Sequence, residues 1–316
     1  MTIGIPKALY YYQYGVLWES FFTELGCNTV VSDNTNEAIF QNGARDSVSE
    51  CCLPTKAYIG HVRSLITRCE YILSPYAAKE SGGKAICTRF WGIGDALRHT
   101  YQNVKLLEYA IYENNLKAQY SSFFHMGKVL GKKPRLIRHA YEAAAEAQHN
   151  HDIKLEKAQN NLIPSNRLKI MLAGRPYVMH DPYISEPVIN ILSELECTIF
   201  FSNRFDKKNA LNHSADISPR LYWTASREAV GAIAAHKKNM DGILMLTVFP
   251  CAQDALACEM ATRVVKDIPI ALITLDGLQG EAGLQTRIES FIEIVNERKA
   301  YGNGKRTTGH FVPSHG

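Results

Sequence analysis

Three of the eight cysteines stand where their thiols could act together. Cys52 opens Cys-Leu-Pro-Thr-Lys, Cys87 opens Cys-Thr-Arg-Phe-Trp-Gly-Ile-Gly-Asp, and Cys251 follows the apolar run 244–250. Each comes just after a strand-like run or at the start of a helix-like run. In an α/β protein, such points meet along one crevice, where ligands bind. Converging thiolates suit a metal ion or an iron–sulfur cluster, and three cysteines would leave one iron open to a substrate or small ligand.

The other five cysteines are expected to pack rather than to bind. Successive side chains of an extended segment point in opposite directions, so Cys52 is a better ligand candidate than its neighbour Cys51. Cys258 comes about two helical turns after Cys251, and core packing is favoured over an approach to a cluster. Small buried thiols are expected at Cys27, Cys69 and Cys197. Spacing alone leaves the main three near even between ligation and packing, because no close Cys-x-x-Cys pair occurs.

Composition indicates a globular protein. The chain has 316 residues, of which 46% are hydrophobic and 21% charged, enough for two domains with real cores. A net charge of +4, scattered along the chain, is too weak to indicate a nucleic-acid partner. The start lacks the apolar stretch of a signal peptide and no run has the length of a membrane span, which predicts a cytoplasmic protein. Eight cysteines in a reducing compartment are not expected to form disulfides.

Several functional classes lack their motifs. No Gly-x-x-x-x-Gly-Lys-Ser/Thr segment is present, so a P-loop NTPase is excluded. Gly92-Ile-Gly94 lacks the third glycine of a nicotinamide-binding fingerprint. Neither His-Glu-x-x-His nor Gly-x-Ser-x-Gly occurs.

Strand-like and helix-like runs alternate, which predicts parallel sheets. Strands are expected at 3–5, 29–31, 71–74, 169–173, 198–201, 242–248 and 268–275. Helices are expected at 16–25, 35–40, from Pro54, and at 101–116, 135–159, 184–195, 225–237, 255–265 and 281–297. The predicted fold is α/β, with two Rossmann-like lobes, a helical insert and a site in the cleft between the lobes. The domains are expected at 1–95, 96–166 (insert and linker), 167–300 and 301–316 (a frayed tail).

Seven motifs occur in an order that resembles the acyl-CoA dehydratase activase-related family, which is similar to the subunits of 2-hydroxyacyl-CoA dehydratases and to double-cubane cluster proteins. They are residues 3–9, 52–56, 60–62, 87–95, 174–177 with 181–183, 248–251 with Asp254, and 280–287. The resemblance runs from about Ile3 to Val295. The chain departs from the pattern in the residues that follow Cys87 and Cys251, and in Cys51, where a small residue is expected.

The resemblance implies an oxygen-sensitive, anaerobic protein with one [4Fe–4S] cluster on Cys52, Cys87 and Cys251. It also implies low-potential one-electron transfer, an ATP-hydrolysing activase as electron donor, and an acyl-CoA or other small ligand at the open iron. Two alternatives stay open: a non-catalytic cluster carrier or scaffold, and a structural zinc site. No general acid or base stands out, and assembly with copies of itself or with other subunits is also left open.

Other polar and aromatic residues have more than one interpretation. His61 could donate to the cluster environment or be a satisfied core histidine. Arg175 could meet an anion in the cleft or pair across the lobes. The tyrosines at 10, 11, 12 and 14, with Trp18, are expected to pack in the core, with a cleft wall or a partner-docking surface as the alternative.

Overall fold

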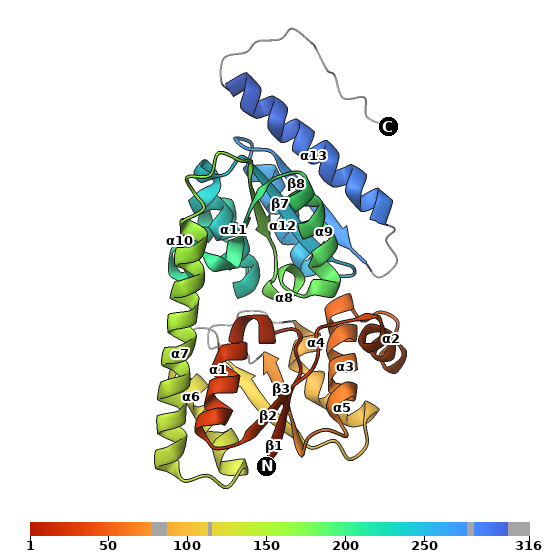
Figure 1. Cartoon of the computed structure of the whole chain (residues 1–316), viewed down its shortest axis with the longest axis vertical. Helices are drawn as coiled ribbons and strands as arrows, with labels where there is room; N and C mark the ends of the chain where they lie inside the picture. The colour runs from red at the N-terminus through yellow and green to blue at the C-terminus, as the bar shows by residue number, and fades with distance from the viewer. Residues whose placement is uncertain (78–86, 113–115, 277–280, 303–316) are drawn as a thin grey trace.

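The computed structural model describes residues 1–77, 87–112, 116–276 and 281–302. Two lobes are stacked along the longest axis, and each is built on a four-stranded, all-parallel sheet (Figure 1). The predicted α/β class with two Rossmann-like lobes is therefore confirmed. Within the described ranges, no helix is both long and apolar enough to cross a membrane.

The first lobe contains a sheet of order β2-β1-β3-β4. Its strands are β1 (Thr2–Ile5), β2 (Asn28–Val31), β3 (Tyr71–Ala77) and β4 (Leu106–Ile111). One face packs on α1 (Tyr11–Glu24), α6 (Leu116–Val129) and the first half of α7 (Pro134–Asn160). The other face packs on α2 (Glu37–Asp46), α3 (Leu53–Leu65), α4 (Thr88–Trp91) and α5 (Ile93–Thr100). Both faces are covered, as is usual for a parallel sheet.

The second lobe repeats this plan, with a sheet of order β6-β5-β7-β8. Its strands are β5 (Lys169–Ala173), β6 (Thr198–Phe201), β7 (Gly242–Val248) and β8 (Ile270–Leu275). One face packs on α10 (Lys207–Ile217), α11 (Thr224–His236) and α12 (Ala252–Val264). The other packs on α9 (Pro182–Glu194) and α13 (Glu281–Gly302). Short helices are α8 (Pro176–Met179), η1 (Ser202–Arg204) and η2 (Lys237–Asn239).

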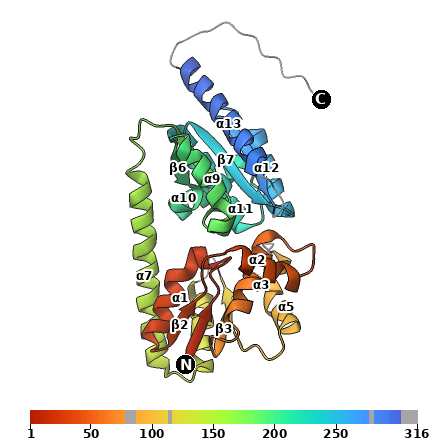
Figure 2. The same cartoon turned by 45° about the vertical axis from the view of Figure 1, so that its right-hand side comes forward.

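The two sheets direct their carboxyl ends toward each other. The α8 helix follows β5, α1 follows β1, and these two helices are in contact between the lobes. Figure 2 shows the same opposition from another side. Strand order reverses between β1 and β3 in one lobe and between β5 and β7 in the other. Both switch points, where parallel α/β proteins bind ligands, thus face the region between the lobes.

The helix predicted over residues 101–116 is wrong. Residues 106–111 form β4, which pairs in parallel with β3 along its length and so extends the first sheet beyond residue 95. Leu, Glu and Ala in this segment are good helix formers, but the edge of the first sheet requires a strand here. The helix predicted at 135–159 is confirmed as α7, a single 27-residue helix that runs beside both lobes (Figure 1). The 301–316 tail falls mostly outside the described residues.

Candidate functional site

Each of the three candidate cysteines occupies the N-cap position of a helix. Cys52 precedes α3, Cys87 precedes α4 and Cys251 precedes α12. None of them uses its side chain to cap the backbone. The unpaired N–H groups of a first helical turn carry partial positive charge. All three thiols therefore lie beside backbone that favours a negatively charged sulfur or ligand.

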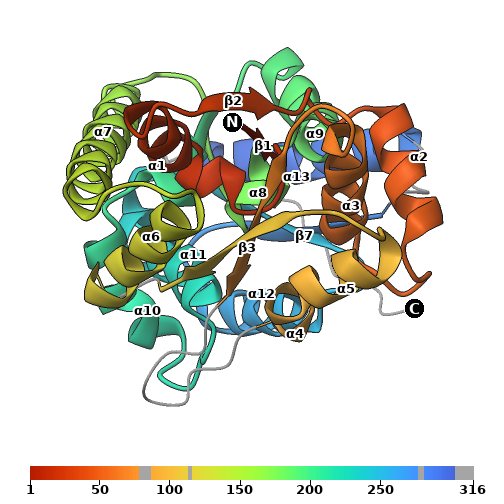
Figure 3. The same cartoon turned by 90° about the horizontal axis from the view of Figure 1, so that it is seen from below.

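Two of these cysteines hold equivalent places in the two lobes. Cys87 is the first residue that the structure describes after β3, and Cys251 comes three residues after the end of β7. Strands β3 and β7 occupy the same place in their sheets, next to the switch point. Figure 3, from below, shows α4 and α12 at the ends of these strands. The fold thus presents two thiols at matching positions of facing sheets.

One apolar cluster connects the three thiols. We call it the interlobe cluster; it contains the buried Cys52, and Cys87 and Cys251 pack against it half-buried. Tyr177 of α8 belongs to this cluster. Burial raises the pKa of Tyr177, the charge of Arg175 opposes the rise, and Asp254, Cys52 and Cys251 add smaller increases. Both thiols therefore lie near Tyr177. The cluster includes residues of both lobes. Cys52 lies near enough to Cys87 for the charge of Cys87 to raise its pKa slightly.

The thiols do not form a closed ligand shell. Among the described residues, no three His, Cys, Asp or Glu side chains approach closely enough to hold a metal ion. The donor type suits an iron–sulfur cluster, since three soft thiols stand at helix N-cap positions, whereas structural zinc requires four ligands. The residues present therefore fit a cluster in donor type, although their sulfurs do not form a metal-holding group among the described residues.

Burial favours the neutral form of the Cys52 and Cys251 thiols by raising the pKa of each. It raises the pKa of Cys52, which Thr55 counteracts through a contact between its Oγ1 and the cysteine Sγ at 3.1 Å. Burial also raises the pKa of Cys251 to about 12, with a further contribution from the Asp254 carboxylate. A metal ligand must be a thiolate, so metal uptake here would release protons.

Arg89 connects the loop that carries Cys52 to the helix that Cys87 starts. Its Nη1 donates to Cys51 Sγ at 3.3 Å and its Nη2 donates to the carbonyl oxygen of Glu50 at 2.8 Å. Cys51 is thus held by a guanidinium rather than by apolar packing. Sequence reasoning missed this role, although Arg89 stands two residues after Cys87 in the motif itself.

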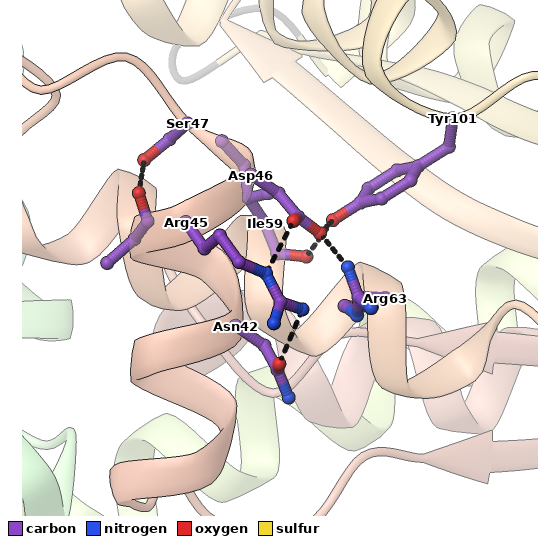
Figure 4. A network of polar contacts seen from close by, with 8 residues as sticks. Asn42, Arg45, Asp46, Ser47, Ile59, Arg63 and Tyr101 are labelled. Atoms are coloured by element: carbon purple, nitrogen blue, oxygen red, sulfur yellow. Dashed lines mark hydrogen bonds and ion pairs between the residues drawn. The ribbon is translucent and has the colours of Figure 1, made fainter.

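A polar network connects α2 and α3, the two helices on either side of the loop that carries Cys52 (Figure 4). Asp46, the last residue of α2, pairs with Arg63 of α3 and accepts from the Tyr101 hydroxyl at 2.8 Å. Burial acts to raise the pKa of Asp46, but Arg63 and Tyr101 outweigh it and hold the pKa below its usual range. The loop from α2 to Cys52 therefore leaves from a firmly anchored residue.

The α2 and α3 helices also touch backbone to backbone. A Cβ atom at Gly60 would lie 1.9 Å from the carbonyl oxygen of Ile39, and one at Gly43 would lie 1.8 Å from that of Lys56. Only glycine permits this approach. Gly60 of the Gly-His-Val segment thus has a packing role.

Arg175 forms its ion pair within one lobe, and the alternative of a pair across the lobes is wrong. Its Nε donates to Asp254 Oδ1 at 2.8 Å, and its Nη2 reaches Ser226 and Gln253. Both charged groups are buried. Because Asp254 lies in the first turn of α12, this pair sets the position of the helix that begins after Cys251.

His61 is a satisfied buried histidine in a chain that joins the lobes, which we call the relay. Ser32 Oγ lies 2.8 Å from His61 Nδ1, and Thr35 Oγ1 lies 2.9 Å from His61 Nε2. Thr35 Oγ1 donates to Asp181 Oδ2, in the second lobe, at 2.7 Å. Burial, with the charge of Lys7, lowers the pKa of His61 to about 4. Burial also raises the pKa of Asp181 to about 6.

The remaining sequence predictions concern the aromatic residues of α1 and the cysteines outside the candidate site. Trp18 is buried in the core, as predicted, whereas Tyr11, Tyr12 and Tyr14 are half-buried and also line a cavity between the lobes. Cys258 is buried in the core beneath α10, α11 and α12, which confirms packing. The three cysteines predicted to pack are buried or half-buried: Cys27, Cys69 and Cys197.

These features define a class: a two-lobed parallel α/β protein whose facing sheet edges carry cysteines at helix N-termini. The family model of the CoA enzyme activase uncharacterised domain (DUF2229) matches residues 2–204, and the chain belongs to that family. The matched segment contains Cys52 and Cys87 and ends before Cys251. No curated protein matches the chain.

Proposed function

We propose that this protein carries one [4Fe–4S] cluster between its lobes on Cys52, Cys87 and Cys251. In this proposal it acts as an electron-transfer or reductive subunit of the 2-hydroxyacyl-CoA dehydratase type. The observation that carries the proposal is the shared placement of the three cysteines. Each caps a helix, and each lies in or against the same apolar cluster. Membership of the activase-related family supports the same class of chemistry.

The surrounding residues have defined parts in this proposal. The bound cluster would supply one-electron transfer at low potential. The helix N–H groups behind the three cysteines would donate toward sulfur, and the interlobe cluster would keep water away. Arg89 would hold Cys51 aside from the site. With three protein thiolates, one iron would remain open to a small ligand such as an acyl-CoA carbonyl group.

The electron would come from an ATP-hydrolysing partner. The sequence contains no phosphate-binding loop motif, so the chain is expected to hydrolyse no ATP alone. An activase would dock, reduce the cluster and leave. Intrinsic ATPase activity in the pure protein would contradict this division of labour.

Anaerobic reconstitution with iron and sulfide tests the proposal. Single Cys→Ser changes at the three positions should each lower bound iron and visible absorption by at least about half, because each removes one of three protein ligands. The matched controls are Cys27→Ser, Cys69→Ser and Cys197→Ser, which should retain the iron of the wild type. Full iron content in all three site variants would refute the assignment.

The same preparation distinguishes two other functions, a structural zinc site and a cluster carrier, from the proposed one. Zinc without sulfide in the purified protein would favour a structural metal site. A cluster whose spectrum is unchanged by acyl-CoA would favour a carrier, with a fourth protein ligand such as Cys51 or Cys258. A spectrum that shifts with acyl-CoA supports ligand binding at an open iron.

A further inference from the structure

A cavity of about 970 Å³ opens between the lobes beside α7. Most of its lining comes from Lys7 and α1 in the first lobe, from η1 and α10 in the second, and from α7. Figure 1 shows where these elements lie. No cysteine of the described residues lines it, so it is separate from the candidate thiol site. Its volume lies in the range of small-molecule pockets.

Arg204 is a charged residue in the second-lobe wall of the cavity. It ends η1, just after β6, at the sheet edge where parallel α/β proteins bind ligands. Its guanidinium carbon lies 4.3 Å from the centre of the Phe201 ring, within the range of a cation–π contact. Its Nε is buried without a hydrogen-bond partner. Burial lowers the pKa of Arg204, and no described carboxylate lies within ion-pairing distance to offset that cost.

The first lobe contributes a second cation and an aromatic wall. Lys7 follows β1, and its ammonium lies 5.9 Å from the centre of the Tyr11 ring, with no ion pair to a described carboxylate. Tyr11, Tyr12 and Tyr14 stand along α1 on the same wall. The cavity therefore offers cations from two lobes together with flat aromatic surface.

The acidic residues of the lining are largely engaged. Glu19 accepts from Tyr11 at 2.8 Å, Asp152 accepts from Gln148 at 2.8 Å, Glu228 pairs with Lys207 at 2.7 Å, and Asp206 caps α10. Glu156 is the one lining carboxylate without such a partner among the described residues. These hydrogen bonds hold the carboxylates in place without cancelling their charge, so an oxyanion here depends on direct contact with Arg204 and Lys7, neither of which has an ion pair among the described residues.

We propose that this cavity binds a small organic oxyanion with a flat ring, whose phosphate or carboxylate group is held by Arg204 and Lys7 and whose ring packs on the tyrosines of α1. A guanidinium presents paired N–H groups that match either oxyanion, and it would gain the partner that the free protein lacks. Because the walls come from both lobes, the bound ligand bridges them.

Titration calorimetry on the full chain tests this with three ring compounds: phenyl phosphate, benzoate and the neutral phenol. At least one oxyanion should bind with a Kd of about 1 mM or lower, and phenol should not bind in that range. A preference for phenyl phosphate or for benzoate identifies the natural headgroup as phosphate or carboxylate. Arg204→Gln should weaken binding by about tenfold or more, because a charged hydrogen bond is lost.

Two further variants make the result specific. Lys7→Gln, from the other lobe, should weaken binding about threefold to tenfold. Arg138→Gln, at an exposed position on α7, should leave it unchanged. Absence of binding by both oxyanions up to about 10 mM would overturn the proposal. Equal binding of phenol, or undiminished binding in both the Arg204 and Lys7 variants, would overturn it as well.

Discussion

Replacing Thr35 by valine removes the hydroxyl that joins the lobes at the relay while conserving the shape of the side chain. Thr35 Oγ1 lies 2.9 Å from His61 Nε2 and 2.7 Å from Asp181 Oδ2. All three residues are buried. The variant therefore leaves one N–H donor and one carboxylate oxygen without a partner and without water to replace it.

The expected loss of stability follows from these two orphaned groups. A buried polar group that loses its hydrogen bond costs about 1–3 kcal/mol, so two such groups give about 2–6 kcal/mol. The Tyr12 hydroxyl, near enough to Asp181 to influence its pKa, offsets part of this cost. We expect a decrease of about 3 kcal/mol in the free energy of unfolding.

Urea unfolding at pH 7.5, followed by fluorescence and far-UV circular dichroism, measures this loss. Thr35→Ser keeps the hydroxyl and should cost less than about 1.5 kcal/mol. Thr100→Val is the matched control, because its exposed hydroxyl donates only to the Ala96 carbonyl; it should change stability by about 0.5 kcal/mol or less. If Thr35→Val were no more destabilising than Thr100→Val, the relay would carry no stabilising contact between the lobes.

Three further outcomes are expected. Burial lowers the pKa of His61 to about 4, below its value in the unfolded chain. The wild-type protein should therefore lose about 3 kcal/mol of stability as pH falls from about 6.5 toward 4. His61→Gln should not show this loss when unfolding is measured across that range. Gly60→Ala should lower the melting temperature by several degrees or prevent folding, because its Cβ would overlap the Ile39 carbonyl; a normal melting temperature would exclude the backbone contact. Arg175→Met should cost about 3–5 kcal/mol by leaving Asp254 buried without a cation, and adding Asp254→Asn should recover part of it in thermal unfolding.

The sequence was sufficient for seven of the eight described strands and for the N-cap positions of Cys52 and Cys251. Apolar runs bounded by helix starts predicted seven of the strands, because buried parallel strands read as continuous hydrophobic segments. The eighth, β4, was missed, since Leu106–Ile111 consists largely of residues that also favour helices. The N-cap positions of Cys52 and Cys251 followed from Pro54 and from the apolar run ahead of Cys251.

Contacts between distant segments could not be predicted in this way. Arg175 and Asp254 are 79 positions apart, and Thr35 and Asp181 are 146 apart. Spacing carries no information about such pairs, because they depend on how two lobes are packed. The same limit applies to the oxyanion cavity, whose walls come from separate segments of both lobes and from α7.

The relay has a direction, and that direction can be reversed. With Asp181 ionised, the Thr35 hydroxyl donates a hydrogen bond to the carboxylate, so its oxygen accepts from Nε2–H of His61, and Nδ1 of His61 accepts from the Ser32 hydroxyl. Burial raises the pKa of Asp181 to about 6, so mildly acidic solution favours its protonated form, which would donate to Thr35 instead of accepting from it. The contact between the lobes therefore links an ionisable carboxyl group in one lobe to a serine hydroxyl in the other through a neutral imidazole.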